Sequence, residues 1–197
     1  MDDTFGSVAR PPRLTTPNGI YHVTARGNRR QVIFEDDRDR RTFLTLLHQV
    51  VARRCWACHS YCLMPNHFHL VLQIPSADLS PGMQALNSRY AQRFNRRYGV
   101  DGHLFQGRFH AVAVESDWHL LELARYLALN PVRGGLCGGP ADWPWSSYQA
   151  LIGRRPTPSF LTVERLLGYF GPDLSSRREA FRMFVQDAQQ PRAAASL

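Results

Sequence analysis

The feature that most constrains this fold is a pair of apolar runs separated by only three residues. Trp56–Leu63 and His67–Ile74 carry aromatic, aliphatic and β-branched residues, and Met64-Pro65-Asn66 lies between them. Two strand-like runs with so short a connection are typical of a β-hairpin, although the turn type is not fixed by the sequence. We therefore expect an antiparallel sheet that contains this hairpin.

Other predicted elements flank the hairpin in a regular order. Residues 19–26 and 109–114 have the alternation and side-chain types of strands. Three helices are predicted from apolar positions that repeat at helical spacing. Their first residues or caps are expected at Asp36 or Asp37, at Ser80, and at Ser116 or Asp117. Pro131 is expected to stop the third helix.

The resulting order, β-α-β-β-α-β followed by a helix, predicts an α+β fold. Two βαβ-like halves favour a ferredoxin-like sandwich, an antiparallel sheet with helices packed on one face. Residues 1–18 are interpreted as an N-terminal arm, 19–152 as the main domain, and 153–197 as a helical extension with a partly disordered end. Two short helices are expected there, near 163–169 and from Ser176, where Glu179 would complete a capping box.

Composition narrows the class of function. The chain is 44% hydrophobic, which makes a disordered protein a poor interpretation, and its net charge of +8 favours a polyanionic partner such as nucleic acid. All 24 basic residues are arginine, and none is lysine. A GC-rich genome would explain this composition, but guanidinium groups bind phosphate well whatever its origin. No segment is long and apolar enough for a membrane span, and no secretory signal or disulfide framework is evident, so we expect a cytoplasmic protein.

The run His67-Phe68-His69 is a candidate metal site. Strand side chains alternate, so the two imidazoles should point the same way, about 6.6 Å apart along the backbone, while Phe68 enters the core. Two imidazoles leave positions open on a divalent ion for substrate oxygens. A pair of histidines that only forms hydrogen bonds at the sheet is the alternative.

The segment 65–71 resembles the histidine–hydrophobe–histidine (HUH) motif of single-tyrosine transposases, and in particular those associated with repetitive extragenic palindromes (REP). The similarity covers roughly residues 17–152. Further blocks match in order: 19–23 with Arg26-Gly27-Asn28, then 87–90, 102–109, 125–133 and 143–148. This resemblance implies an HUH catalytic domain at 19–152.

The resemblance also implies the chemistry. Among seven tyrosines, it places the nucleophile at Tyr126, and it gives Asn130, one helical turn later, a supporting role at the metal. Asn130 stands where better-known relatives have glutamine, so its metal contact is less secure than those of His67 and His69. The implied reaction forms a 5′-phosphotyrosine and a free 3′-hydroxyl beside a DNA hairpin, with Mg²⁺ or Mn²⁺ as cofactor.

Other functions, another metal site and a set of DNA contacts are also considered for this chain. The scaffold could instead serve a non-catalytic regulator that binds hairpin DNA, or a metal-dependent nuclease. Zinc at Cys55, Cys58, His59 and Cys62 is a weaker possibility, because one CxxC lacks a second pair. We expect a monomer that binds single-stranded or hairpin DNA, with bases stacked on Tyr98, His103 or Phe105. The predicted phosphate contacts are Arg26, Arg29, Arg30, Arg89, Arg93, Arg96, Arg97 and Arg108.

Overall fold

The predicted hairpin forms one half of a four-stranded antiparallel sheet. The structure, a computed structural model, describes residues 15–187. Strands β2 (Ala57–Met64) and β3 (His67–Gln73) pair with each other, and β3 also pairs with β1 (Ile20–Arg26), which pairs with β4 (His110–Ala113). The order β2-β3-β1-β4 is that of a ferredoxin-like sheet. The predicted α+β class is confirmed.

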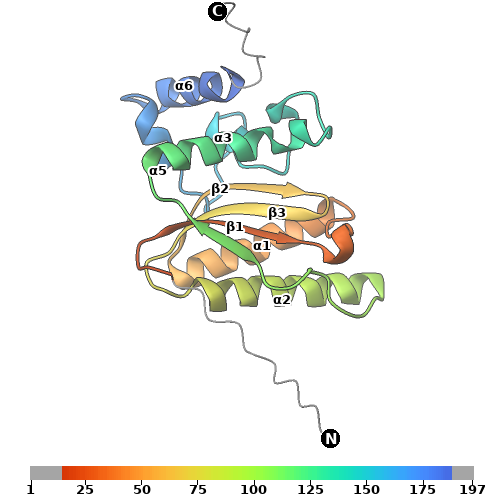
Figure 1. The fold of residues 1–197 in the computed structure, drawn as a ribbon. Coiled ribbons are helices and arrows are strands. Elements are labelled where there is room, and N and C mark those ends of the chain that lie inside the picture. Colours follow the sequence, from red (N-terminus) through yellow and green to blue (C-terminus); the bar gives the residue numbers. More distant parts are fainter. Residues whose placement is uncertain (1–14, 188–197) are drawn as a thin grey trace, which may run out of the picture.

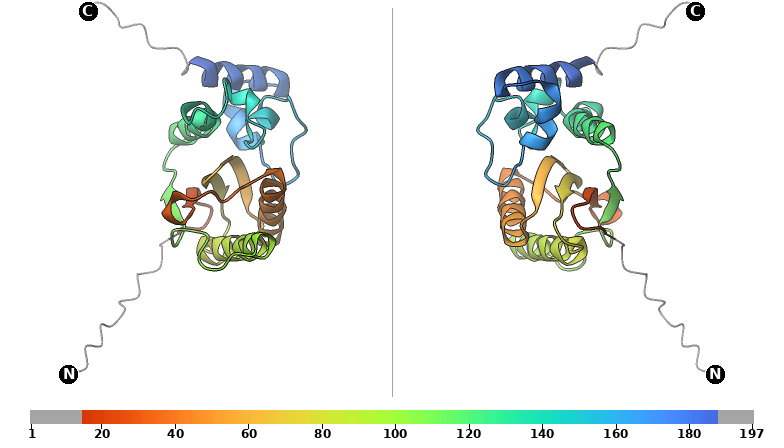
Figure 2. Two further views of the ribbon diagram at one scale, coloured as in Figure 1. Left: turned by 90° about the vertical axis from the view of Figure 1, so that its right-hand side faces the viewer. Right: turned by 90° about the vertical axis from the view of Figure 1, so that its left-hand side faces the viewer.

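Helices cover both faces of this sheet (Figure 1). Helices α1 (Asp37–Arg54) and α2 (Leu79–Tyr98) pack on one face, and α3 (Asp117–Arg133) lies across the other with the C-terminal elements. The side views in Figure 2 show the same three layers. The expectation of helices on one face only was therefore wrong, because α3 buries Leu120, Leu123 and Leu127 against the second face.

Alternation along β3 divides its side chains between two cores. Phe68, Leu70 and Leu72 are buried in the larger core, which α1 and α2 complete. Val71 faces the smaller core beneath α3. Because successive strand residues point to opposite faces, His67 and His69 share the face of Val71 and look toward α3. The larger core thus fixes the direction of the histidine pair.

Side-chain caps mark the starts of α1 and α3, whereas α2 begins at Leu79, one residue before the predicted Ser80, without a side-chain cap bond from Asp78. Asp36 caps α1 by accepting from the backbone N–H groups of Arg38 and Asp39, and Ser116 caps α3 by accepting from that of His119. The predicted stop at Pro131 was wrong, since α3 continues to Arg133. Pro131 lies in the last turn of the helix, which closes after it with a Gly134 N–H to Asn130 C=O bond of 2.8 Å.

The remaining elements are short, apart from the last helix. They are η1 (Asn28–Arg30), η2 (Pro140–Asp142), α4 (Tyr148–Leu151), α5 (Glu164–Leu167), η3 (Gly168–Phe170) and α6 (Leu174–Asp187). The predicted capping box from Ser176 was wrong: Asp173 accepts from the backbone N–H groups of Ser175 and Ser176, and Glu179 pairs with Arg182. Most of the predicted N-terminal arm and the predicted frayed end lie outside the described residues.

The segment after α3 covers the outer edge of β2. Leu63 donates its N–H to Trp145 C=O, Ser147 donates to Tyr61 C=O, and Thr162 donates to Cys58 C=O, at 2.8–3.0 Å. This satisfies backbone groups that an edge strand would otherwise expose. Leu161, Leu166 and Phe181 also join the larger core. The proposed domain boundary at residue 152 stays a prediction. Within 15–187, no helix combines the length and apolarity needed to cross a bilayer.

Replacing Ser147 with alanine should destabilise the fold. Its buried hydroxyl lies 2.9 Å from Ser60 Oγ and accepts the N–H of Tyr61 at 3.0 Å, so the substitution leaves buried polar groups without a partner. We expect a loss of about 1–3 kcal/mol in the free energy of unfolding, measured by urea denaturation. Ser175→Ala, at an exposed serine, is the control. Equal stability of both variants would contradict a structural role for this edge.

Candidate active site

The two histidines of β3 lie side by side beneath α3. The ring centroids of His67 and His69 are 4.9 Å apart, and their planes are inclined by 79°. His69 is almost completely buried, with 6% of its surface exposed, while His67 is partly open to solvent. The strand therefore presents one enclosed and one accessible imidazole on the same face.

A hydrogen-bond partner holds each imidazole at Nδ1. His67 Nδ1 lies 2.7 Å from Asn66 Oδ1, so this nitrogen must carry the proton. His69 Nδ1 lies 2.9 Å from His22 Nε2, and the two rings stack with an interplanar angle of 16°. Asn130 Nδ2 lies 2.9 Å from His69 Nε2; an amide donor there leaves the ring proton on Nδ1. Both rings then keep a lone pair on Nε2, the form that binds metals.

Burial keeps these rings neutral. It lowers the pKa of His67 to about 4, helped by the nearby charge of Arg26. It lowers the pKa of His69 to about 3, with further contributions from His67, His22 and Arg26. The pKa of His22 falls to about 4, again mainly through burial, with His110 and His119 adding to the effect. Near pH 7 all three imidazoles are therefore uncharged and able to donate electron pairs.

Helix α3 brings a phenol and an amide to the same place. Tyr126, Asn130 and Arg133 follow the i, i+4, i+7 spacing, so they line one flank of the helix next to its buried leucine stripe. The ring of Tyr126 meets that of His69 edge to face, with centroids 5.7 Å apart. Tyr126 is 39% exposed, and the Arg133 guanidinium lies 5.7 Å from its ring centroid. The phenol is thus both beside the histidines and open to a substrate.

The donor set fits a divalent cation with open positions. His67 and His69 offer two nitrogens. A half-turn of the Asn130 amide exchanges its nitrogen for its oxygen, so it can either donate to His69 or provide an oxygen ligand. Within residues 15–187, no group of three or more His, Cys, Asp or Glu side chains could hold a metal. Substrate oxygens would therefore have to complete the coordination, as in other catalytic sites.

Two of the predicted DNA-binding arginines border the histidines. Arg26 and Arg108 line a cavity together with His67, His69 and His110. Arg29 and Arg30 are exposed in the adjoining turn, where Asn66 Nδ2 donates to Arg30 C=O at 3.0 Å. The turn is therefore anchored next to the start of β3.

Three other predicted arginines lie on the opposite side of the sheet. Arg89, Arg93 and Arg96 line a groove on α2, which packs on the face away from α3. They are exposed and can receive phosphates, but only from a DNA strand that passes around the sheet. The structure does not bring them together with the histidine pair.

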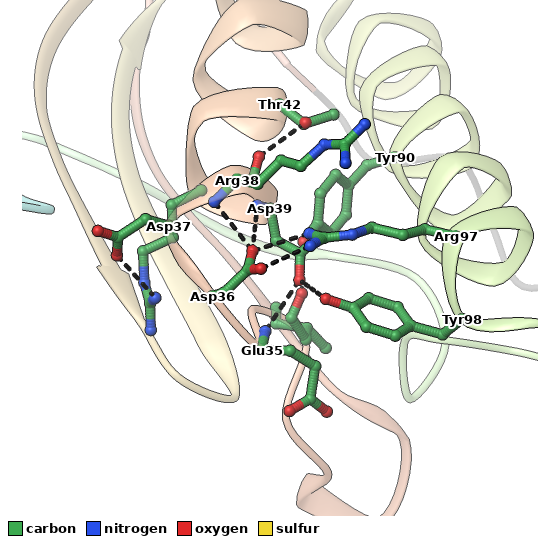
Figure 3. Close-up of polar contacts among 11 residues, drawn as sticks. Glu35, Asp36, Asp37, Arg38, Asp39, Thr42, Tyr90, Arg97 and Tyr98 are labelled. Atoms are coloured by element: carbon green, nitrogen blue, oxygen red, sulfur yellow. Dashed lines mark hydrogen bonds and ion pairs between the residues drawn. The ribbon is translucent and has the colours of Figure 1, made fainter.

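Arg97 and Tyr98 are engaged in a network that joins α1 to α2 (Figure 3). Arg97 forms ion pairs with Asp36 and Asp39, at 2.5 and 2.6 Å, and Tyr98 donates its hydroxyl to Asp39 at 2.8 Å. The Arg97 hydrogen bond holds the pKa of Asp36 below its ordinary value. The carboxylates of Asp36 and Asp39 therefore occupy the polar groups of Arg97 and Tyr98. Phe105 is largely buried, whereas His103 is exposed.

The sequence analysis overlooked His22 as a site residue. Tyr21, Val23 and Ala25 enter the larger core, so alternation alone places His22 on the face of the histidine pair. Its contact with His69 depends on the register between β1 and β3, which the sequence does not encode locally. The cysteines, by contrast, do not converge: Cys58 and Cys62 are buried in separate cores.

Comparisons with known proteins identify the family of the chain. Residues 15–130 match the family model "Transposase IS200 like". A curated Haemophilus influenzae protein, named as a candidate REP-associated tyrosine transposase, is 26% identical over 98 residues, which cover 44% of this chain and 56% of that protein. The chain thus matches little more than half of the length of this relative.

A solved structure is similar over most of the chain. It is that of a REP-associated tyrosine transposase bound to a REP hairpin, with a TM-score of 0.63 and 19% identity. The match covers 85% of this chain and 96% of the other, and at this identity it shows a shared fold. Because the family model spans more than half of the sequence, the chain belongs to the IS200-like transposase family, and the predicted kinship with REP-associated tyrosine transposases is confirmed.

Proposed function

We propose that this transposase-family protein nicks single-stranded DNA beside palindromic hairpins and rejoins the ends, with Tyr126 as nucleophile and a divalent cation as cofactor. One observation carries the proposal. The neutral imidazole of His69, which lies against that of His67 on β3, contacts the ring of Tyr126 and the amide of Asn130 on α3. A strand and a helix that are far apart in the sequence thus bring the proposed cation ligands and the proposed nucleophile together.

The proposed step exchanges one phosphoester for another. The phenol oxygen of Tyr126 attacks a backbone phosphorus, a phosphotyrosine bond forms at the 5′ side, and the bond to the 3′ oxygen breaks. The phenol proton passes to solvent, and the departing 3′ oxygen takes up a proton. A phenolate is a better leaving group than an alkoxide, so a 3′-hydroxyl can reverse the step and join a strand without ATP.

The surrounding residues orient this chemistry. Asn66 and His22 hold the protons of His67 and His69 on Nδ1. The guanidinium of Arg133 lies 5.7 Å from the centroid of the Tyr126 ring and holds a positive charge beside the nucleophile. Because the tyrosine ring rests edge-on against a buried histidine, its approach to the phosphate is restricted, which lowers the entropic cost of in-line attack.

A cation would be held by His67 and His69, with Asn130 in support. Mg²⁺ or Mn²⁺ suits a site whose remaining ligands are oxygens. When bound, the ion would act as a Lewis acid toward the phosphate oxygens and offset their negative charge.

DNA would reach the site across an arginine surface. Arg26 and Arg108 line the cavity with the histidines and can neutralise phosphates beside the scissile bond, and Arg29 and Arg30 are exposed in the turn that follows Arg26. The similar solved protein is bound to a REP hairpin, which supports the same class of substrate for this chain. The monomeric state and the cytoplasmic location remain predictions.

Tyr126→Phe should abolish covalent capture of DNA. With a labelled hairpin that carries single-stranded flanks, and with Mg²⁺ present, wild-type protein should form an adduct that survives denaturing electrophoresis. The variant lacks the attacking oxygen and should give none, while it binds the hairpin within about twofold of wild type, since the ring is kept. Tyr169→Phe, at another exposed tyrosine, is the control.

The same assay separates the alternatives. Binding without an adduct in the wild-type protein would favour a non-catalytic hairpin-binding regulator. Cleavage that survives Tyr126→Phe would favour a nuclease that uses water. Either result would contradict the tyrosine mechanism.

Removal of either imidazole should weaken cation binding. We expect His67→Ala and His69→Ala to lower the affinity for Mn²⁺ roughly tenfold or more in the presence of hairpin DNA, measured by electron paramagnetic resonance of the free ion. Nicking should fall in parallel, whereas DNA binding should persist. His48→Ala, an exposed histidine on α1, should leave both properties unchanged. An unchanged Mn²⁺ affinity in both site variants would locate the metal elsewhere.

Binding should depend on salt through the arginines near the site. On single strands the log–log slope of affinity against salt is about −0.7 for each phosphate neutralised. Arg26→Ala and Arg108→Ala should each reduce its magnitude by about that amount, measured by fluorescence anisotropy between about 50 and 300 mM salt, over which the Debye length falls roughly two- to threefold. Arg53→Ala on α1 serves as the control. A slope that neither site variant changes would exclude these phosphate contacts.

A further inference from the structure

The turn that follows β1 has a backbone conformation that arginine rarely adopts. Arg29 and Arg30 are consecutive, and their φ angles are 50° and 62°, in the left-handed region. For a residue with a β-carbon this region carries a steric cost, so two such residues in succession need other contacts to hold them. Both side chains are exposed. The turn therefore depends on bonds from other parts of the chain.

Hydrogen bonds from two other segments hold this turn. Gly27 donates its N–H to Asn66 C=O at 2.8 Å, and Asn28 donates its N–H to Leu104 C=O at 2.8 Å. The side chain of Asn66 adds a bond of 3.0 Å from its Nδ2 to Arg30 C=O. Asn66, the residue that precedes β3, thus supplies both a backbone partner and a side-chain partner.

The other end of the Asn66 amide faces a proposed cation ligand. Its Oδ1 lies 2.7 Å from His67 Nδ1. The Arg30 carbonyl can only accept a hydrogen bond, so the amide nitrogen must point to it and the amide oxygen to His67. That oxygen in turn requires the imidazole proton on Nδ1. The backbone of the turn thus determines which nitrogen of His67 keeps its lone pair.

Phosphate binding would favour the observed form of the turn. A phosphate that is bound by Arg29 or Arg30 in this conformation contributes free energy that offsets the steric cost of the backbone. The Arg30 carbonyl is then held in place for the Asn66 amide. Without a phosphate, a fraction of the molecules relaxes from the left-handed form, and in that fraction the amide and the imidazole proton lose their fixed direction.

The same bonds act in the reverse direction. A cation on His67 Nε2 withdraws electron density from the ring, which makes the Nδ1–H group a stronger donor to Asn66 Oδ1. The amide, and with it the turn, is then held more firmly. Because the coupling of two ligands is reciprocal, the cation and the phosphate should each raise the affinity for the other by the same factor.

We propose that Asn66 is a positioning residue that couples phosphate binding at Arg29 and Arg30 to cation binding at His67. It fixes the tautomer of this imidazole while the turn is in its left-handed form. The inference rests on the proposed function, because it takes His67 as a cation ligand and DNA as the source of the phosphate. The chain would thereby complete its cation site only when DNA is bound.

The first test is the tautomer of His67 in the metal-free protein, determined from the imidazole nitrogen chemical shifts in NMR spectra. We expect the proton mainly on Nδ1 in the wild-type protein and in Asn66→Asp, which keeps an acceptor for it. Asn66→Ala lacks this acceptor and should move the proton to Nε2 in most molecules. Gln49→Ala, at an exposed amide on α1, is the control. An unchanged tautomer in Asn66→Ala would overturn the inference.

The second test measures the coupling itself in the Tyr126→Phe protein, which cannot consume its DNA. The affinity for Mn²⁺ is measured with and without hairpin DNA, by electron paramagnetic resonance of the free ion. Phosphate oxygens at the cation raise the ratio of the two affinities in every variant, so a change in this ratio isolates the turn. Asn66→Asp cannot donate to Arg30 C=O, and Arg29→Gly adopts the left-handed form without steric cost. Each should lower the ratio by roughly 5-fold or more, whereas Gln49→Ala should not.

The outcomes separate this inference from the proposed function. A ratio that both turn variants leave unchanged would overturn the coupling, while covalent capture of DNA by Tyr126 would stand. If the tautomer and the ratio change as expected in a protein that forms no adduct, the positioning role is supported and the catalytic proposal is overturned. An Mn²⁺ affinity that does not depend on His67 would overturn both.

Discussion

Alternation along β3 is the constraint on which the site depends. Burial of Phe68, Leu70 and Leu72 between the sheet and two helices fixes which way every residue of that strand points. A shift of register by one residue would place polar imidazoles in the larger core and aromatic rings under α3, at a cost of several kcal/mol. The histidine pair therefore takes its orientation from packing on the opposite face, where no chemistry occurs.

Much of the fold could be predicted from local pattern. The hairpin, the strands at each end and the helix starts at Asp36 and Ser116 follow from alternation and capping, which act over a few residues. The wrong predictions concern the ends of helices, where nearby residues can each start or stop the helix. Asp173 caps α6 earlier than Ser176 could, and α3 accommodates Pro131 in its last turn. Coverage of the second face depends on tertiary packing, which no local pattern encodes.

The main residues of the candidate site could be predicted from the sequence, but their contacts in the folded protein could not. His67, His69, Tyr126 and Asn130 were identified from a motif and a resemblance, and the structure brings all four within contact of one another through His69. His22 was missed because its partner is set by strand register. Arg97 was grouped with the other arginines, since charge alone cannot tell a phosphate contact from an ion pair with Asp39. Contacts between residues far apart in the sequence, such as these two, could not be predicted from local patterns.

The covering of β2 by the chain that follows α3 has a consequence for biosynthesis. When α3 has left the ribosome, the nascent polypeptide already contains both imidazoles, the amide and the phenol. The partners of the outer edge, at Trp145, Ser147 and Thr162, emerge only after it. Because an open strand edge is prone to pair with other chains, the interval before these residues emerge is the period of greatest aggregation risk. The outer edge of the sheet is therefore protected only after the segment that follows α3 has been synthesised.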